Sequence, residues 1–298
     1  MLRMGSTVLR LHCTTPDEYS AAVSSWLEGT HFVFDEAAFS DRDEVVSLGW
    51  ELDAEDVKAI LMDTVRSLPE ERVTEIHFYA AGLISSGEEV PESARNLHSA
   101  LMGIWPDAEK EYASDLLDAA RSVCGRESGI AAILGTGSNS CFYDGKDIVK
   151  NVRSCGFILG DEGGGAALGR DFMADFLKGL MPEELSREFA AEFTVDYMTV
   201  VKNVYRGSAP SKYLGSFAPF IMDRYGKYDY VREIADRNFR RFIERALLQY
   251  DVEKYPVGVV GGFGYAFRDI FTRIASGYGI RVSTIIPTPM DGLIEYHR

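Results

Sequence analysis

The sequence has 298 residues, of which 46% are hydrophobic, and its formal net charge at pH 7 is -15. A chain of this length can bury a large core and commonly forms two domains. The negative charge disfavours nucleic acid and membrane as partners, because both need clustered Lys and Arg. The four cysteines lack the spacing of a metal site and the density of a disulfide scaffold. We therefore expect a globular, cytoplasmic protein that binds a small molecule.

The first part of the chain predicts strands alternating with helices. Strands are expected at residues 7–13, 32–35, 45–48 and 74–79, and helices at residues 17–26, 52–68, 93–104 and 112–124. The strand at 74–79 runs into the small residues 80–82, and this order of helix, strand and small-residue turn is typical of an α/β unit. Asp115 stands near the start of the last of these helices.

The second part begins with an antiparallel meander. Strands are predicted at 130–134, 141–143 and 147–152, with the segment GTGSNS (135–140) as a tight turn between the first two. The sequence then becomes mostly helical, with helices at 163–179 and 231–249. Further elements are a strand at 257–260, a glycine break, a helix at 265–276 and a strand at 281–285.

Two glycine-centred segments are the best candidates for chemistry: GTGSNS (135–140) and GDEGGGAALGR (160–170). Glycine allows consecutive backbone N–H groups to approach an anion closely. Thr136, Ser138 and Asn139 add side-chain donors. An ordinary hairpin turn is the alternative for the first segment. It is not a dinucleotide fingerprint, because a strand and not a helix follows its glycines.

The acidic candidates also have simpler explanations. Asp161 precedes a helix and can be an N-cap, or it can bind a sugar hydroxyl or hydrated Mg²⁺. Asp115 can likewise be a helix start. The glycines at 261, 262 and 264 can simply connect a strand to a helix, or they can form a flat surface for an adenine ring. The five histidines have no ligand spacing, and we assign no metal cage.

Six segments in this order resemble the N-acetylglucosamine kinase family within the BadF/BcrA-type ATPases. They are HFYAAG (77–82), SDLLDAARSVCG (114–125), ILGTGSNSCFYDG (133–145), GFILGDEGGGAALG (156–169), VGVVGGFGYAF (257–267) and PMDGLIEYH (289–297). The family belongs to the actin, Hsp70 and hexokinase superfamily. The resemblance therefore implies an α/β fold of two ribonuclease-H-like (actin-like ATPase) domains, residues 1–114 and 115–298, with a cleft between them and a helical insertion in the second.

The resemblance also implies a reaction and a set of site residues. It implies that the protein phosphorylates an N-acetylated amino sugar with ATP as donor and Mg²⁺ as cofactor. The implied acceptor is the 6-hydroxyl of N-acetylglucosamine, and a homodimer is also implied. Asp115 would be the general base. The sugar-binding residues would be Thr136, Ser138, Asn139, Gly156 and Asp161. The nucleotide-binding residues would be Gly135, Gly137, Gly261 and Gly262.

The sequence departs from the family pattern near its start. Family members have a D-x-G-x-T-K-T type turn there, and the nearest remnant here is Gly5-Ser6-Thr7, with Arg3 in place of the acid. Lys146, Lys150 or Arg170 could replace the missing positive charge. A weakly active or inactive sugar or nucleotide sensor on the same fold is therefore an alternative. An iron–sulfur activator of radical dehydratases is a second one, which the absence of that branch's glycine-rich motif disfavours.

Overall fold

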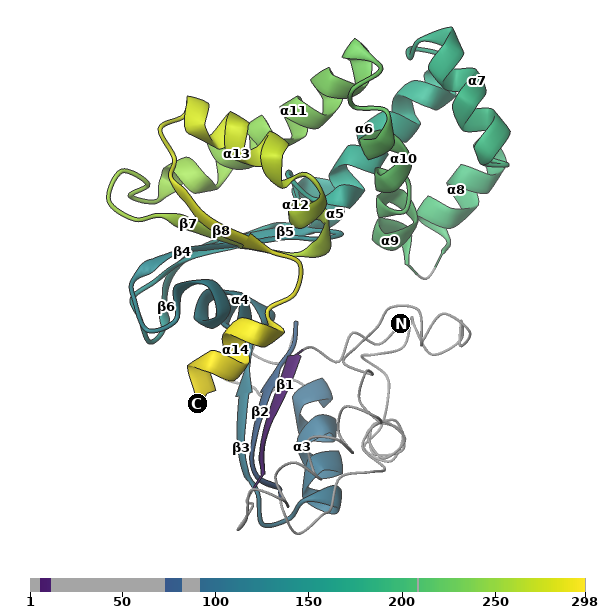
Figure 1. The fold of residues 1–298 in the computed structure, drawn as a ribbon. Helices are drawn as coiled ribbons and strands as arrows, with labels where there is room; N and C mark the ends of the chain where they lie inside the picture. The colour runs from purple at the N-terminus through teal and green to yellow at the C-terminus, as the bar shows by residue number, and fades with distance from the viewer. Residues whose placement is uncertain (1–5, 12–72, 82–91, 208, 298) are drawn as a thin grey trace, which may run out of the picture. The chain divides into compact units, whose positions relative to one another are not determined.

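The structure is a computed structural model of the chain, and it describes residues 6–11, 73–81, 92–207 and 209–297 (Figure 1). The helices predicted at 17–26 and 52–68 and the strands predicted at 32–35 and 45–48 lie outside these residues. The chain divides into an N-terminal unit, Met1–Asp118, and a C-terminal unit, Ala119–Arg298. The division falls four residues later than the expected boundary at 114/115, within a helix.

The N-terminal unit contains a three-stranded sheet in the order β1-β2-β3. Strand β1 (Ser6–Leu11) pairs antiparallel with β2 (Val73–Tyr79), and β2 pairs parallel with β3 (Glu109–Ala113). Helix α3 (Glu92–Ile104) connects β2 to β3, because parallel neighbours need a crossover. Leu97 and Leu101 of α3 share a buried cluster with Ile76 and Phe78 of β2. The strand at 74–79 and the helix at 93–104 are thus confirmed, and the strand at 7–13 is confirmed over 7–11, since residues 12 and 13 lie outside the described residues.

The helix predicted at 112–124 needs a correction. Residues 109–113 form β3, and helix α4 (Asp115–Cys124) begins only after Ser114. The Ser114 hydroxyl accepts a hydrogen bond from the Leu117 N–H at 3.1 Å, so Ser114 and not Asp115 provides the N-cap.

The C-terminal unit contains a five-stranded sheet in the order β6-β5-β4-β7-β8. Its strands are β4 (Gly129–Leu134), β5 (Ser138–Tyr143), β6 (Ile148–Val152), β7 (Val257–Val260) and β8 (Val282–Ile286). β4, β5 and β6 form the predicted antiparallel meander, and β4, β7 and β8 run parallel. β5 begins at Ser138, which pairs with Leu134, and not at residue 141 as predicted. The turn is therefore limited to Gly135–Gly137.

Helices cover both faces of this sheet (Figure 1). One face carries α11 (Asp229–Arg245), α12 (Gly262–Ala266) and α13 (Arg268–Gly277), and the other carries α4 and α14 (Met290–His297). Close packing of α4 on β7 requires glycine in the strand, because a Cβ on Gly258 would lie 2.5 Å from a methyl carbon of Val123. The single helix predicted at 265–276 is in fact α12 and α13, separated at Phe267.

Between β6 and β7 the chain is helical, as predicted. A short helix α5 (Gly156–Leu159) leads to α6 (Gly165–Lys178), and α7 (Glu183–Glu192), α8 (Tyr197–Tyr205), α9 (Pro210–Gly215), α10 (Ala218–Asp223) and the 3-10 helix η3 (Leu247–Gln249) complete the segment with α11. Its core is aromatic: the Phe189 ring meets those of Phe172, Phe217 and Phe220 edge-on at 5.1 to 5.4 Å. Among the residues that the structure describes, none of the helices is both long and apolar enough to span a membrane.

Candidate functional site

The turns after β4 and β7 lie against each other at one edge of the C-terminal sheet. These strands are parallel neighbours, with Ile133 opposite Val260, so their carboxyl ends meet. Gly261 has a φ of 130°. A Cβ on it would lie 2.4 Å from the Leu134 carbonyl oxygen and 3.3 Å from the Gly135 nitrogen. The fold thus brings the turn at Gly135 and the turn at Gly261, which were both expected to bind the nucleotide, into direct contact.

The turn at Gly135–Gly137 is also bonded to the bend that opens α6. The Gly165 N–H donates to the Gly135 carbonyl at 2.9 Å, and the Ala166 N–H donates to the Thr136 carbonyl at 2.8 Å. A Cβ on Gly164 would lie 2.7 Å from the Gly137 carbonyl carbon. The two glycine segments therefore form one junction, which local sequence could suggest but not establish.

This junction changes which amides can face a ligand. The expectation that amides of both glycine segments point at a phosphate fails for Gly165 and Ala166, because their N–H groups are bonded to the turn. Within the described parts of the chain, the N–H groups of Thr136 and Gly137 make no hydrogen bond. An anion could therefore be bound by these two amides of the 135–137 turn.

Asp161 lies at the centre of the junction. Its backbone has a φ of 55°, in the left-handed region that Asp and Asn tolerate best after glycine. Its side chain is buried, and its Oδ1 accepts from the Ser138 N–H at 3.3 Å. Burial raises the pKa of the Asp161 carboxyl, whereas the bond from Ser138 opposes the rise. A buried carboxylate fixed in this way can accept hydrogen bonds from hydroxyl groups in a defined direction.

Asp161 and Gly137 are also matched in shape. A Cβ on Gly137 would lie 2.7 Å from Asp161 Oδ2, so only glycine leaves room for the carboxylate in its observed position. The glycine in the turn and the acid in the bend therefore depend on each other.

The other sugar-binding candidates lie nearby in the chain but are held differently. The Asn139 Oδ1 accepts from Asn151 Nδ2 at 2.9 Å, so this side chain is fixed to the neighbouring strand β6. Gly156 begins α5, has a φ of 70°, and its carbonyl accepts from the Gly160 N–H at 2.8 Å. The α5 side chains Ile158 and Leu159 are 74% and 75% exposed.

Among the three basic residues proposed to replace missing positive charge, Arg170 is the one beside the bend. Its Nη1 donates to the Phe157 carbonyl at 2.6 Å, and its charge lowers the pKa of Asp161, against the effect of burial. Lys150 instead donates to the Gln249 carbonyl. Lys146 lies in the turn between β5 and β6, where its backbone N–H donates a hydrogen bond to Asp144 Oδ1.

Asp115 belongs to the N-terminal unit, where it occupies the first turn of α4 and is partly buried. Its role as a base remains a prediction.

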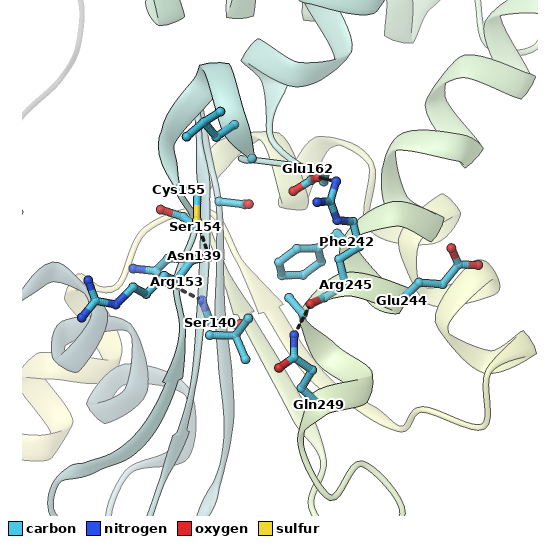
Figure 2. Close-up of a pocket in the computed structure, with 15 residues that line it drawn as sticks. Asn139, Ser140, Arg153, Ser154, Cys155, Glu162, Phe242, Glu244, Arg245 and Gln249 are labelled. Carbon is cyan, nitrogen blue, oxygen red and sulfur yellow. Dashed lines mark hydrogen bonds and ion pairs between the residues drawn. The ribbon is translucent and has the colours of Figure 1, made fainter.

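A pocket of about 350 Å³ lies between the β5–β6 pair and α11 (Figure 2). Arg245 forms an ion pair with Glu162 at its rim, while the side chains of Arg153 and Asn139 point away from Phe242. Sequence analysis missed the contribution of α11, because it lies about a hundred residues from β5 in the chain. The lining residues are Ser138, Asn139, Ser140, Val152, Arg153, Ser154, Cys155, Leu159, Gly160, Glu162, Phe242, Glu244, Arg245, Ala246 and Gln249.

Comparison with known proteins gives two informative likenesses. A solved structure from Porphyromonas gingivalis, of a provisionally assigned N-acetylglucosamine kinase, is 34% identical, with a TM-score of 0.77, covering 84% of this chain and 87% of its own. A second, from Chromobacterium violaceum and assigned in the same way, is 22% identical, with a TM-score of 0.56, covering 74% of this chain and 75% of its own. The second likeness concerns the fold alone. No model of a protein family matches the sequence, and no curated protein does.

Proposed function

Because this chain belongs to the N-acetylglucosamine kinase family, we propose that it transfers the γ-phosphoryl group of ATP to the 6-hydroxyl of N-acetylglucosamine with the help of Mg²⁺. The observation that carries the proposal is the 34% identity, over 84% of the chain, to a structure provisionally assigned as an N-acetylglucosamine kinase. The junction of the two glycine segments at the edge of the C-terminal sheet supports it, since phosphoryl transfer depends on positioning and charge stabilisation more than on covalent chemistry.

We assign the nucleotide to the two contacting turns, with Gly135 and Gly137 at the phosphates and Gly261 and Gly262 at the adenosine. The N–H groups of Thr136 and Gly137, which bond to none of the residues that the structure describes, support the first assignment. Gly262 is exposed, and a Cβ on it would meet nothing within 4 Å, which supports an open backbone surface for the adenine ring.

Mg²⁺ bound with ATP takes most of its ligands from phosphate oxygens and water, and only one or two from carboxylates. The carboxylate oxygens of Asp161 beside the 135–137 turn are of the type that Mg²⁺ prefers, so the bend fits either this metal or a sugar hydroxyl. We assign Asp161 to the sugar and leave the ion to the phosphates and water. When bound, the metal neutralises charge on the transferred phosphoryl group.

On the sugar side, we assign Thr136, Ser138, Asn139, Gly156 and Asp161 to binding. The buried Asp161 carboxylate would accept hydrogen bonds from ring hydroxyls, which excludes ligands that lack them. Asp115 would accept the proton of the acceptor hydroxyl as the new P–O bond forms.

We further propose that residues 1–114 and 115–298 form two ribonuclease-H-like domains, and that the protein forms a homodimer. For the C-terminal unit, the sheet order β6-β5-β4-β7-β8, in which β5 runs opposite to the other four strands, supports this fold.

The test is ADP production from MgATP with and without N-acetylglucosamine. We expect sugar-dependent turnover, and a decrease in kcat of about 10² to 10⁴-fold in Asp115→Asn if this carboxylate is the base. Asp107→Asn is the matched control, because Asp107 is an exposed carboxylate of the same unit. Equal rates in Asp115→Asn and wild type would exclude the base, and wild type without sugar-dependent turnover would exclude the kinase.

The alternative is a sugar or nucleotide sensor with little or no turnover. The missing acid of the first phosphate turn, where Arg3 stands, favours it, because one lost preorganised contact can cost about a hundredfold in rate. A rise in melting temperature with N-acetylglucosamine and MgATP, without ADP production, would identify the sensor.

A further inference from the structure

One face of α11 holds the bend that follows Asp161. Asn238, Phe242 and Arg245 are spaced by four and three residues, so they lie on the same face of the helix. Arg245 pairs with Glu162. Phe242 packs so closely on Gly163 that a Cβ there would lie 2.7 Å from the Phe242 Cβ. The helix thus contacts the bend with three side chains in register.

Asn238 is the polar member that binds the backbone of the bend. Its Oδ1 accepts from the Gly163 N–H at 3.0 Å, and its Nδ2 donates to the Gly164 carbonyl at 3.1 Å. The side chain is 4% exposed and lies among the apolar residues of α11, such as Phe239 and Phe242. A neutral amide offers one acceptor and one donor group on the same short side chain. The orientation of the amide is therefore fixed, since a flip would place its NH₂ group against the Gly163 N–H and its oxygen against the Gly164 carbonyl oxygen.

Asn238 is connected to Asp161 through these two glycines. The Gly164 N–H donates to the Asp161 carbonyl at 3.0 Å, which closes the turn that gives Asp161 its left-handed backbone. On the other side, a Cβ on Gly164 would collide with the Thr136 and Gly137 backbone, so the bend has little room to move. A shift at Asn238 would be transmitted to the Asp161 carboxylate, and through it to the Ser138 N–H.

We propose that Asn238 is a positioning residue: it holds the Gly163-Gly164 backbone in the one arrangement that presents the Asp161 carboxylate to the sugar. This inference rests on the proposed function, in which Asp161 binds sugar hydroxyls. Asn238 itself acts only through the bend.

Asn238→Asp tests the role, because it keeps the shape and replaces the amide donor by a titratable oxygen. When ionised, the new carboxylate faces the Gly164 carbonyl oxygen and repels it. When protonated, its O–H can donate to that oxygen, and burial raises its pKa into a measurable range. We expect KM for N-acetylglucosamine to rise at least about tenfold at pH 8, as for the loss of one buried hydrogen bond, and to return toward the wild-type value near pH 5.5. The value of kcat should change much less.

Asn203→Asp is the matched control, since it makes the same chemical change in α8. Its KM should follow that of wild type at every pH. Asn238→Leu removes both hydrogen bonds at similar size, so its KM should be raised at low and high pH alike. A KM for Asn238→Asp that equals wild type at pH 8, or that is raised equally at all pH values, would overturn the proposal.

Hydrogen exchange of the segment 160–166 separates this inference from the proposed function. Relative to wild type at the same pH, Asn238→Asp should exchange faster at pH 8 at Gly164, whose N–H closes the turn on the Asp161 carbonyl, and should exchange at the wild-type rate near pH 5.5. Unchanged exchange at pH 8 would overturn the positioning role even in an active enzyme. Wild-type protein without sugar kinase activity, but with this pH-dependent exchange in the variant, would reject the proposed function while retaining the clamp on the bend.

Discussion

Replacing Gly164 by alanine should force apart the two glycine segments that form the site. The backbone of Gly164 has φ -90° and ψ 164°, which alanine adopts without strain, so the local conformation is no obstacle. The obstacle is the neighbouring turn. A Cβ would lie 2.7 Å from the Gly137 carbonyl carbon and 2.8 Å from the Gly137 and Thr136 carbonyl oxygens. All three are backbone atoms, which no change of rotamer can move.

The size of the effect follows from these distances. Ordinary contact begins at 3.4 Å, so the segments must separate by about 0.7 Å at the closest atom pair. The hydrogen bonds from Gly165 and Ala166 to the turn, now 2.9 and 2.8 Å, would then lengthen to about 3.5 Å, beyond the normal range. Overpacking of this kind costs about 1 to 3 kcal/mol, and each weakened bond adds about 0.5 to 1.5 kcal/mol. We expect the free energy of unfolding to fall by about 2 to 6 kcal/mol.

Urea denaturation of Gly164→Ala and Gly277→Ala beside wild type measures this difference. Gly277 is exposed at the end of α13, and a Cβ there would meet nothing within 4 Å, so its alanine variant should be neutral or slightly stabilised. In Gly164→Ala the surviving folded protein should also lose about tenfold to a hundredfold in kcat/KM, because displacements of this size disturb alignment of the reactants. Equal midpoints for the two variants would refute the reasoning.

Three further outcomes are expected. Burial raises the pKa of the Asp161 carboxyl, so the stability that this group contributes is present at low pH and is lost as the pH rises through the folded-state pKa. Asp161→Asn should therefore be more stable than wild type at pH 7 but not near pH 3, by urea denaturation, while its KM for sugar rises; a gain that does not depend on pH would contradict this. Lys110 donates from its Nζ to the Trp105 and Ala108 carbonyls at 2.6 and 2.7 Å. Lys110→Met should thus lower the unfolding free energy by about 1 to 3 kcal/mol, and an unchanged urea midpoint would show that these bonds contribute nothing. Removal of divalent metal with EDTA should stop ADP production and added Mg²⁺ should restore it, whereas turnover that persists in EDTA would argue against the metal.

Several elements could be predicted from the sequence because their signals are local. The apolar run at 130–134 and the helical spacing after Gly163 identify β4 and α6 without knowledge of any partner. The start of β5 could not be predicted in this way, because Ser138 and Ser140 have the composition of a turn. They are strand residues because Leu134 pairs with Ser138 and because Tyr250, far along the chain, bonds the buried Ser140 hydroxyl at 3.0 Å.

For the site, the sequence by itself determined the residue types at the two glycine segments and, through their resemblance to a known family, the reaction to expect. Only the tertiary structure decided that the turn and the bend are bonded to each other, that the amides of Gly165 and Ala166 are therefore occupied, and that Asn238 supports the bend. The physical reason is that composition and periodicity report on neighbours in the chain. The Asp161 carboxylate is oriented by a hydrogen bond from Ser138, 23 residues away in the chain. The bend that follows it is held at Gly163 by Asn238, which is 75 residues away.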